Sequence, residues 1–380
     1  MSKKIVKIFV LSFAVCLLFC GCGEQSVKKT VTGIDPVFEE PLGYYNEHPS
    51  VIDEGNERYV YYTKNEKIND ASTESIVVRK GVIEDGKWKY GEPSVALSPS
   101  KDGWDGKKVF QADVVKGVFN YKGEAYGYLM AYAGVKSEIS RKGAQINLAV
   151  SKTPTGPFVK ISDNPFITWD AKDYSHYGEV TTDGVSEPSL INFNGQSQII
   201  LFYSLNSPNT SVSCKYVLLD LSEGLDSLTQ RKGERGNLLS RKGITDMSSD
   251  NACIGADLAL NEEKTHIYAV RDYLPIPTLS PSVAEAVQVI KAPVNILTET
   301  ESESSPKWEI VDDKISSLDT AVWEKEGMFG YDRIYSGSFI GNGFGYVKED
   351  SVYITFTSCA TASSTADYKF TSMIHEYKVI

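Results

Sequence analysis

Hydrophobic and polar residues alternate over short stretches along most of the chain, and one pattern recurs. Each copy has a short apolar run, then a turn rich in Gly, Asn or charged residues, then an aromatic-rich run. Period-two alternation on both sides of such a turn predicts β-hairpins rather than helices. The copies begin at His48 (HPSVI), Ala112 (ADVVKGVFNYKGEAYGYLMAYAG), Glu187 (EPSLINFNGQSQIILFYS), Ala256 (ADLALNEEKTHIYAVRDY) and Ser336 (SGSFIGNGFGYVKEDSVYITFTS).

Further strand-like runs follow several copies, for example SIVVRKGVIEDGKWKYG, INLAVSKTPTGPFVKI and VQVIKAPVNILTETESESSPKWEIV. Five units of about four strands predict an all-β fold, a five-bladed β-propeller. Two β-sandwiches are the alternative, but they do not require the turns to keep the same offset from a preceding apolar strand. In a propeller the first strand of every blade lines the central channel, so equivalent positions of different blades become neighbours.

Composition agrees with many short strands, because the 380 residues include 22 Tyr and 30 Gly but only 5 Met. The formal net charge is −11, and no long basic stretch follows the first residues. Nucleic-acid binding needs clustered Lys and Arg along the phosphate backbone, so we expect no nucleic-acid partner.

The N-terminus predicts a secretory signal. Lysines precede an apolar run from Ile8 to Cys20 that is too short to remain as a membrane-spanning helix. The Gly21–Cys22 pair resembles the lipobox of bacterial lipoproteins, although Phe19 and Cys20 depart from its usual residues. The resemblance implies cleavage before Cys22, lipidation of Cys22 and a lipid-anchored, extracytoplasmic protein, with simple secretion as the alternative.

The expected organisation is therefore a signal peptide (1–21), a tether (22–40) and a propeller (41–380). Loss of three signal-peptide lysines changes the net charge from −11 to −14. The remaining cysteines, Cys214, Cys253 and Cys359, match no disulfide framework and no zinc spacing, so we expect buried thiols, with one pair possible. Phosphate-loop, zinc-protease and nucleophile-elbow motifs are missing from the sequence.

Titratable residues stand at or beside the start of each first strand. They are Glu47 and His48, Asp113, Glu187, Asp257, and Asp332 with Arg333. Carboxylates that face one channel repel each other and raise one another's pKa, which costs stability unless function or a cation compensates. This convergence predicts a functional site at the axis.

These residues carry a family resemblance. ADVV with Asp113, SEPSLI with Glu187, and the run INLAVSKTPTGPF with the following NPF resemble the five-bladed propeller glycoside hydrolases of the family 43 kind. The resemblance extends from about Pro41 to Ile380.

The resemblance implies three carboxylates at the axis: a base from blade one, an acid-tuning Asp from blade two and an acid Glu from blade three. Carried over by motif, Glu187 is the general acid and Asp113 tunes it. It also implies hydrolysis of a glycosidic bond in a plant or microbial polysaccharide or its oligosaccharides, by inversion. In inversion a base across the sugar activates water while the acid protonates the leaving oxygen.

The pattern breaks at His48, which stands where the family has an Asp before Pro. His48 itself is one candidate base, and Glu47 is another if a bulge redirects it. A third possibility needs no protein base, as in a phosphorylase or in a surface lipoprotein that only binds glycans.

Other residues are expected to serve the substrate. Arg271 and Arg333 are the cations that a phosphorylase would use at the channel mouth, and aromatic residues on loops would stack on sugar rings. The residues expected to bind substrate are Glu47, Trp104, His176, Asp257, Arg271 and Arg333, with Tyr174 and Tyr177 beside His176. No cofactor is expected, although in this clan a single structural cation at the propeller axis is possible.

Overall fold

A computed structural model describes residues 36–38, 40–168, 184–207, 210–230, 236–244, 255–273, 284, 286–298, 306–316, 333–359 and 372–380. Strands dominate these residues, together with two 3-10 helices, η2 (Leu225–Gln230) and η3 (Val294–Leu297). The expected all-β class is confirmed. None of the helices in the described residues is long and apolar enough to cross a membrane.

The strands form successive antiparallel groups in chain order. The first group contains β2 (Glu47–Asp53), β3 (Glu57–Lys67), β4 (Asp70–Glu84), β5 (Lys87–Tyr90) and β6 (Ser94–Leu97). The next contains β7 (Lys108–Tyr121), β8 (Glu124–Val135), β9 (Gln145–Ser151) and β10 (Val159–Lys160). It is followed by β11 (Gly184–Asn192), β12 (Gln198–Ser207), β13 (Thr210–Asp220) and β14 (Asn237–Leu238).

The later groups repeat this order. One contains β15 (Asp257–Asn261), β16 (His266–Tyr273), β17 (Ala286–Pro293) and β18 (Glu309–Ser316). The last contains β19 (Arg333–Asn342), β21 (Tyr353–Cys359), β22 (Met373–Lys378) and β1 (Pro36–Phe38), while β20 (Tyr346–Val347) pairs with β15. Short parallel pairings, such as β19 with β2, join neighbouring groups into larger sheets.

Tight turns fix the hairpins. Lys122 and Gly123, between β7 and β8, have φ values of +51° and +78°, and Asp85 and Gly86, between β4 and β5, have +53° and +74°. Two successive left-handed residues make the type I′ turn that matches the right-handed twist of a hairpin. The KG and DG pairs of the sequence therefore mark the turns.

The hydrophobic core lies between neighbouring groups. One buried cluster joins residues of β7–β9 to residues of β11–β13, and another joins β11–β13 to β15–β17. Similar clusters lie between β2–β4 and β7–β9 and between β15–β17 and β19–β22. Each group thus buries its apolar faces against the next, and burial of this kind is the main favourable term in folding.

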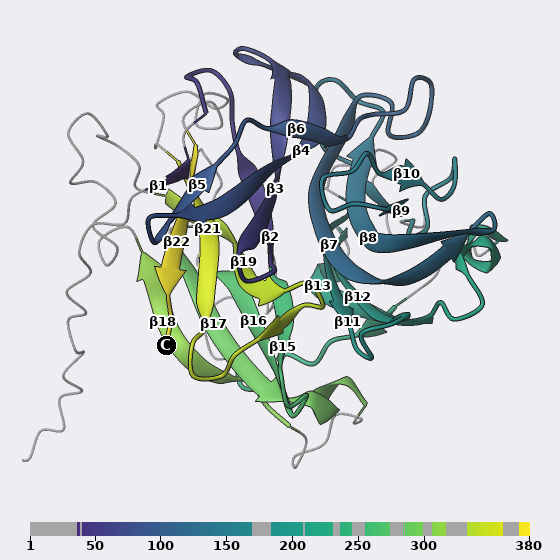
Figure 1. The fold of residues 1–380 in the computed structure, drawn as a ribbon. Helices are drawn as coiled ribbons and strands as arrows, with labels where there is room; N and C mark the ends of the chain where they lie inside the picture. The colour runs from purple at the N-terminus through teal and green to yellow at the C-terminus, as the bar shows by residue number, and fades with distance from the viewer. Residues whose placement is uncertain are drawn as a thin grey trace, which may run out of the picture. The chain divides into compact units, whose positions relative to one another are not determined.

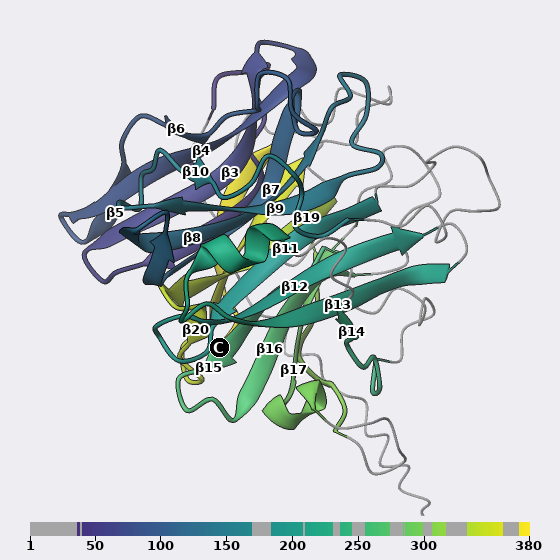
Figure 2. The same cartoon turned by 90° about the vertical axis from the view of Figure 1, so that its right-hand side faces the viewer.

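The first strands of the groups are neighbours. β2 contacts β7, β7 contacts β11, β11 contacts β15, β15 contacts β19, and β19 contacts β2. Figure 1 shows β2, β7 and β19 close together toward the middle of the ribbon, with β10 and β18 toward opposite sides of it. Figure 2 shows β11, β12 and β13 side by side from another direction.

The last group is completed by the beginning of the described chain. β1 pairs with β22, and Glu40 contacts Arg79 and Lys64 through its carboxylate. Paired structure therefore begins within the segment 22–40 that was expected to be a tether, because β22 offers β1 an edge to pair with.

Cys214 and Cys359 are buried, as expected, and Cys253 lies outside the described residues.

Candidate active site

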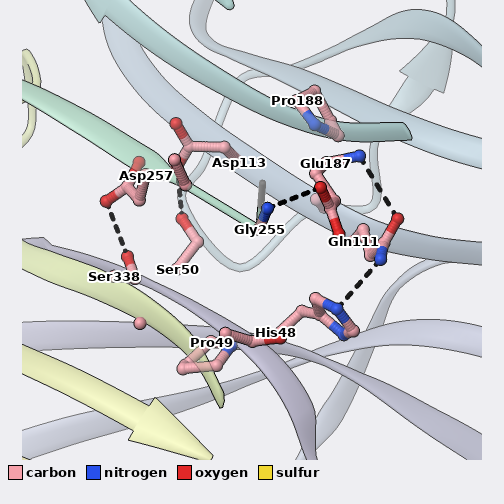
Figure 3. A pocket seen from close by; sticks show the side chains of 14 residues that line it. His48, Pro49, Ser50, Gln111, Asp113, Glu187, Pro188, Gly255, Asp257 and Ser338 are labelled. Atoms are coloured by element: carbon pink, nitrogen blue, oxygen red, sulfur yellow. Dashed lines mark hydrogen bonds between the residues drawn. The ribbon is translucent and has the colours of Figure 1, made fainter. Parts of the chain in front are cut away.

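A pocket opens where the N-terminal ends of β2, β7, β11, β15 and β19 meet (Figure 3). Its empty volume is about 360 Å³, including open solvent at the mouth. The lining residues are His48, Pro49, Ser50, Gln111, Ala112, Asp113, Glu187, Pro188, Gly255, Ala256, Asp257, Ser336, Gly337 and Ser338.

One residue from each first strand, or from just before it, has left-handed backbone geometry. These are His48 (φ +54°), Gln111 (+51°), Glu187 (+54°), Gly255 (+57°) and Ser336 (+52°). The pairing register shifts at this point in β2, β7, β11 and β19, as a β-bulge produces. The shared geometry makes these residues equivalent, and we call them the first ring.

Two residues further along each strand lies a second ring. Its members are Ser50, Asp113, Ser189, Asp257 and Ser338. Serine and aspartate alternate in chain order from Ser50 to Ser338, and each serine hydroxyl donates a hydrogen bond to an aspartate.

The second-ring carboxylates connect neighbouring groups. Asp113 accepts hydrogen bonds from the Ser50 hydroxyl (2.6 Å) and from the Leu190 N–H (2.6 Å), which belong to the groups on either side. Asp257 does the same with the Ser189 hydroxyl (2.7 Å) and the Phe339 N–H (2.8 Å). Both carboxylates thus tie the strands together around the axis.

Both aspartates bind protons more tightly than usual. Burial, together with repulsion from Asp257, raises the pKa of Asp113 to about 7, against the hydrogen bonds that it accepts. Burial likewise raises the pKa of Asp257. Two carboxyls in one site resist ionising together, so the pair retains a proton near neutral pH.

The expected equivalence of Asp113 with Glu187 does not hold. Asp113 belongs to the second ring, and the residue that matches Glu187 in the first ring is Gln111. The reason is the left-handed bulge residue, which sets the register of each strand at Gln111 rather than at Asp113. Asp113 does line the pocket, but its carboxylate is held by Ser50 and Leu190.

Glu187 is the carboxylate of the first ring. Its Oε2 accepts a hydrogen bond from the Gly255 N–H (2.7 Å), and its own N–H donates to Gln111 Oε1 (3.2 Å). These bonds hold the side chain at the pocket lining between β7 and the segment before β15 (Figure 3).

His48 faces the same pocket and is bound by Gln111. The Gln111 amide nitrogen lies 2.9 Å from His48 Nε2. Because Gln111 Oε1 accepts from the Glu187 N–H, which can only donate, the other amide atom is the NH₂ group. Neutral His48 therefore accepts at Nε2 and carries its proton on Nδ1.

Glu47 lies behind His48, with its Oε2 4.0 Å from His48 Nδ1. It is 1% exposed, and Arg141 Nη2 lies 2.8 Å from its Oε2. Arg141 also bonds Glu74, which in turn pairs with Lys108. Glu47 is thus part of a buried ionic network and does not line the pocket.

Asp272, on β16, is a site residue that the sequence did not reveal. Its Oδ1 accepts the Ser336 N–H (2.8 Å), and its Oδ2 lies 2.7 Å from where a Cβ of Gly255 would be. Burial raises the pKa of Asp272 well above its ordinary value, and repulsion from Glu187 adds to this shift. A second carboxyl therefore stands next to the general-acid candidate.

No protein-family model matches the sequence, and no curated protein matches it either. Solved structures do match. An α-L-arabinofuranosidase from Podospora anserina superposes with a TM-score of 0.54 at 10% identity, covering 91% of this chain and 94% of that chain. A family 117 glycoside hydrolase from Zobellia galactanivorans gives a TM-score of 0.52 at 13% identity, with 92% and 89% covered. The catalytic domain of a family 62 α-L-arabinofuranosidase from Coprinopsis cinerea gives 0.51 at 10% identity, with 92% and 96% covered.

The fold is that of the propeller glycoside hydrolases. At this identity the likeness concerns the fold, so the roles of the residues rest on the geometry of the pocket.

Three residues expected at the pocket lie elsewhere. Trp104 stacks on Tyr132 with ring centroids 6.1 Å apart. Arg271 is buried and bonds Gln288 through Nη2 (2.7 Å), because neighbouring residues of β16 point to opposite faces and Asp272 takes the other one. Arg333 begins β19, three residues before the first ring, and is not among the lining residues.

Other expected residues cannot be placed. Cys22, His176, Tyr174, Tyr177 and Asp332 lie outside the described residues. Among the residues that are described, no cluster of three or more His, Cys, Asp or Glu side chains could hold a metal ion.

Proposed function

We propose that the chain is a five-bladed propeller glycoside hydrolase that acts at this pocket with Glu187 as proton donor. The blade count is supported by the succession of antiparallel groups and by the contacts that run from β2 through β7, β11, β15 and β19 back to β2. Each group supplies one first-ring residue.

One observation carries the assignment of activity: a fixed carboxyl at the axial end of the third group, within a fold shared with glycoside hydrolases. Glycoside cleavage needs a carboxyl group that protonates the departing oxygen as the bond from the anomeric carbon breaks. Glu187 lines the pocket, and the Gly255 N–H fixes its orientation. The same Glu187 was assigned as the acid from the motif SEPSLI.

Polar groups around Glu187 suit a sugar. The Gln111 amide, the His48 imidazole and the Ser336 backbone surround the opening, and amides and imidazoles can bond sugar hydroxyls. Since two of the structural relatives are α-L-arabinofuranosidases, we propose furanosides and related pentosides as the first substrates to test.

Both candidate bases of the inverting mechanism are already engaged by neighbouring side chains. His48 Nε2 is already bonded by Gln111, and Glu47 is bonded by Arg141 in a buried network. Substrate or water must displace the Gln111 contact before His48 accepts a proton.

The amide and imidazole in the first ring also favour a second candidate, a surface protein that binds glycans without cleaving them. His48 stands where the resemblance implies the blade-one carboxylate, and Gln111 is the first-ring residue of the second group. A phosphorylase is less supported, because Arg271 and Arg333 do not line the pocket.

We further propose that the protein acts outside the cytoplasm, attached to the bacterial membrane by a lipid on Cys22. The support is the Gly21–Cys22 motif after a short apolar run. Incorporation of a labelled fatty acid into the wild-type chain but not into Cys22→Ser tests the anchor, and equal labelling of the two would refute it.

Turnover by Glu187→Gln tests the activity. Aryl arabinofuranosides, xylosides, galactosides and fucosides, each with a poor and a good leaving group, should be assayed with wild type, Glu187→Gln and the exposed-surface control Glu57→Gln. Loss of the general acid should lower the rate about 10²–10⁴-fold on poor leaving groups and much less on good ones. Binding measured by calorimetry should persist. Undiminished turnover by Glu187→Gln would refute the assignment, and binding without hydrolysis by wild type would favour the glycan-binding alternative.

A further inference from the structure

Asp272 occupies a position that carries no carboxyl in the other groups. It lies on the second strand of its group, two residues after Val270, which pairs with Asp257 of the second ring. The equivalent residues, each two positions after the partner of a second-ring residue, are Thr63, Ala133, Ser204 and Thr357.

A hydroxyl is enough for the hydrogen bond made at this position. In the first group, Thr63 Oγ1 accepts the N–H of Gln111, the first-ring residue of the next group (2.9 Å). In the fourth group, Asp272 Oδ1 accepts the N–H of Ser336, again the first-ring residue of the next group (2.8 Å). The hydrogen bond therefore does not explain why this position carries a carboxyl. Burying a carboxyl also costs free energy of folding.

The additional oxygen of Asp272 lies toward Gly255. Asp272 Oδ2 is 2.7 Å from the point where a Cβ of Gly255 would stand, and the N–H of the same glycine donates to Glu187 Oε2 at 2.7 Å. Glu187 and Asp272 thus approach one glycine, Glu187 at its backbone N–H and Asp272 in the space that its missing side chain leaves. The two carboxyls repel each other when both are ionised.

We propose that Glu187 and Asp272 form a coupled carboxyl pair, with Asp272 as the positioning residue that favours the protonated form of Glu187. This rests on the proposed hydrolase function. In it, Asp272 tunes Glu187 from the second strand of the fourth group, whereas the resemblance assigns that role to Asp113, whose carboxylate is held by Ser50 and Leu190. The proton passes from Glu187 to the glycosidic oxygen as the bond to the anomeric carbon breaks, while Asp272 stays unchanged.

Other charged groups lie near Glu187 and Asp272. Arg271, adjacent on β16, opposes the upward pKa shift of Asp272, but its side chain is bonded to Gln288. The other titratable groups that line the pocket are Asp257 on β15, His48 on β2 and Asp113 on β7. Behind them, Tyr335 on β19 donates to Glu47 on β2, and Arg333 begins β19.

The decisive variant is Asp272→Thr, which imitates the first group. A threonine keeps a hydroxyl for the Ser336 N–H, as Thr63 does for Gln111, and removes only the carboxyl. The alkaline limb of the kcat/KM profile should move to lower pH by about one unit or more. Thr63→Ala is the matched control, because it removes the hydrogen bond without changing a charge and should leave the limb in place.

A second readout does not depend on activity. With ¹³C-labelled glutamate and Glu187→Gln to assign the signal, the Glu187 carboxyl should titrate at lower pH in Asp272→Thr than in wild type. An unchanged Glu187 titration in a folded Asp272→Thr protein would overturn the pair. If wild type cleaves no glycoside but the titration shifts, the pair stands and the hydrolase function fails.

Discussion

The Gln111 amide nitrogen lies 2.9 Å from Nε2 of His48, and the carbonyl oxygen of the same side chain accepts the Glu187 N–H. One amide therefore connects the two pocket residues that the sequence marked as base and acid. Its orientation is fixed, because a backbone N–H only donates, and it holds neutral His48 with the proton on Nδ1. The resting pocket thus presents an imidazole whose Nε2 lone pair is already in use.

Gln111→Glu should change the protonation of His48. A carboxylate at residue 111 can still accept the Glu187 N–H, but it cannot donate to His48 Nε2, and its charge favours the imidazolium. His48 should then hold its second proton to higher pH than in wild type, as followed by imidazole ¹H–¹⁵N spectra. Gln111→Met, which removes the donor without adding a charge, should have a smaller effect. Identical His48 titration in all three proteins would contradict the bonding.

The sequence predicted the strands and turns well, because side-chain alternation and the turn pairs KG and DG are local signals. It placed the start of three copies at His48, Glu187 and Ser336, which are all first-ring residues. The other two copies were begun one residue late, at Ala112 and Ala256. Asp113, which was matched through the motif ADVV, lies two residues after Gln111 and belongs to the second ring.

This error has a physical origin. The first ring is defined by a left-handed residue in a bulge, and here that residue is His, Gln, Glu, Gly or Ser, so residue type does not mark it. Asp272 was missed for a different reason. It lies on a second strand and approaches Gly255, the glycine whose N–H holds Glu187, and no spacing in the sequence encodes this proximity.

The second ring should make stability depend on pH. An unfolded Asp has a pKa of about 3.9, whereas the pKa of Asp113 in the folded chain is about 7. Between these values the folded protein binds more protons than the unfolded chain, so the free energy of unfolding should fall as pH rises from about 4 to about 7.

Asp113→Asn should therefore flatten this dependence. It should also unfold at a lower temperature than wild type at acidic pH, because Asp113 accepts a backbone N–H on each oxygen and an amide has only one acceptor oxygen. Thermal unfolding at several pH values measures both effects. Asp220→Asn, on the exposed end of β13, is the control and should keep the wild-type slope. Equal slopes for Asp113→Asn and wild type would show that Asp113 does not carry the shifted proton.

The buried ionic network behind His48 should be sensitive to loss of its cation. Arg141 bonds both Glu47 (2.8 Å) and Glu74 (2.7 Å), which are 1% and 0% exposed. Arg141→Met should leave two buried carboxylates with less compensation and lower the free energy of unfolding by roughly 3–5 kcal/mol. Urea unfolding measures the loss.

A surface pair provides the comparison. Lys80 and Glu57 form an ion pair whose side chains are 42% and 45% exposed, so Lys80→Met should leave the free energy of unfolding nearly unchanged. If Arg141→Met lowers the free energy of unfolding as little as Lys80→Met does, the ion pairs of Arg141 with Glu47 and Glu74 contribute little to stability.

Gly255→Ala should disable the pocket by a local collision. At Gly255 a Cβ would stand 2.7 Å from Asp272 Oδ2, and φ is +57°, so alanine adds both left-handed strain and a displaced carboxyl. Since misplacement of a catalytic group by about 1 Å can cost about 100-fold in rate, we expect a loss of that order in kcat on glycosides with poor leaving groups.

Gly55→Ala separates the backbone strain from the collision, because Gly55 has φ +84° and nothing within 4 Å of its Cβ position. It should lose about 1–2 kcal/mol of stability and keep its turnover. If both alanine variants lose stability alike and both keep wild-type kcat, the space that Gly255 leaves for Asp272 has no part in turnover.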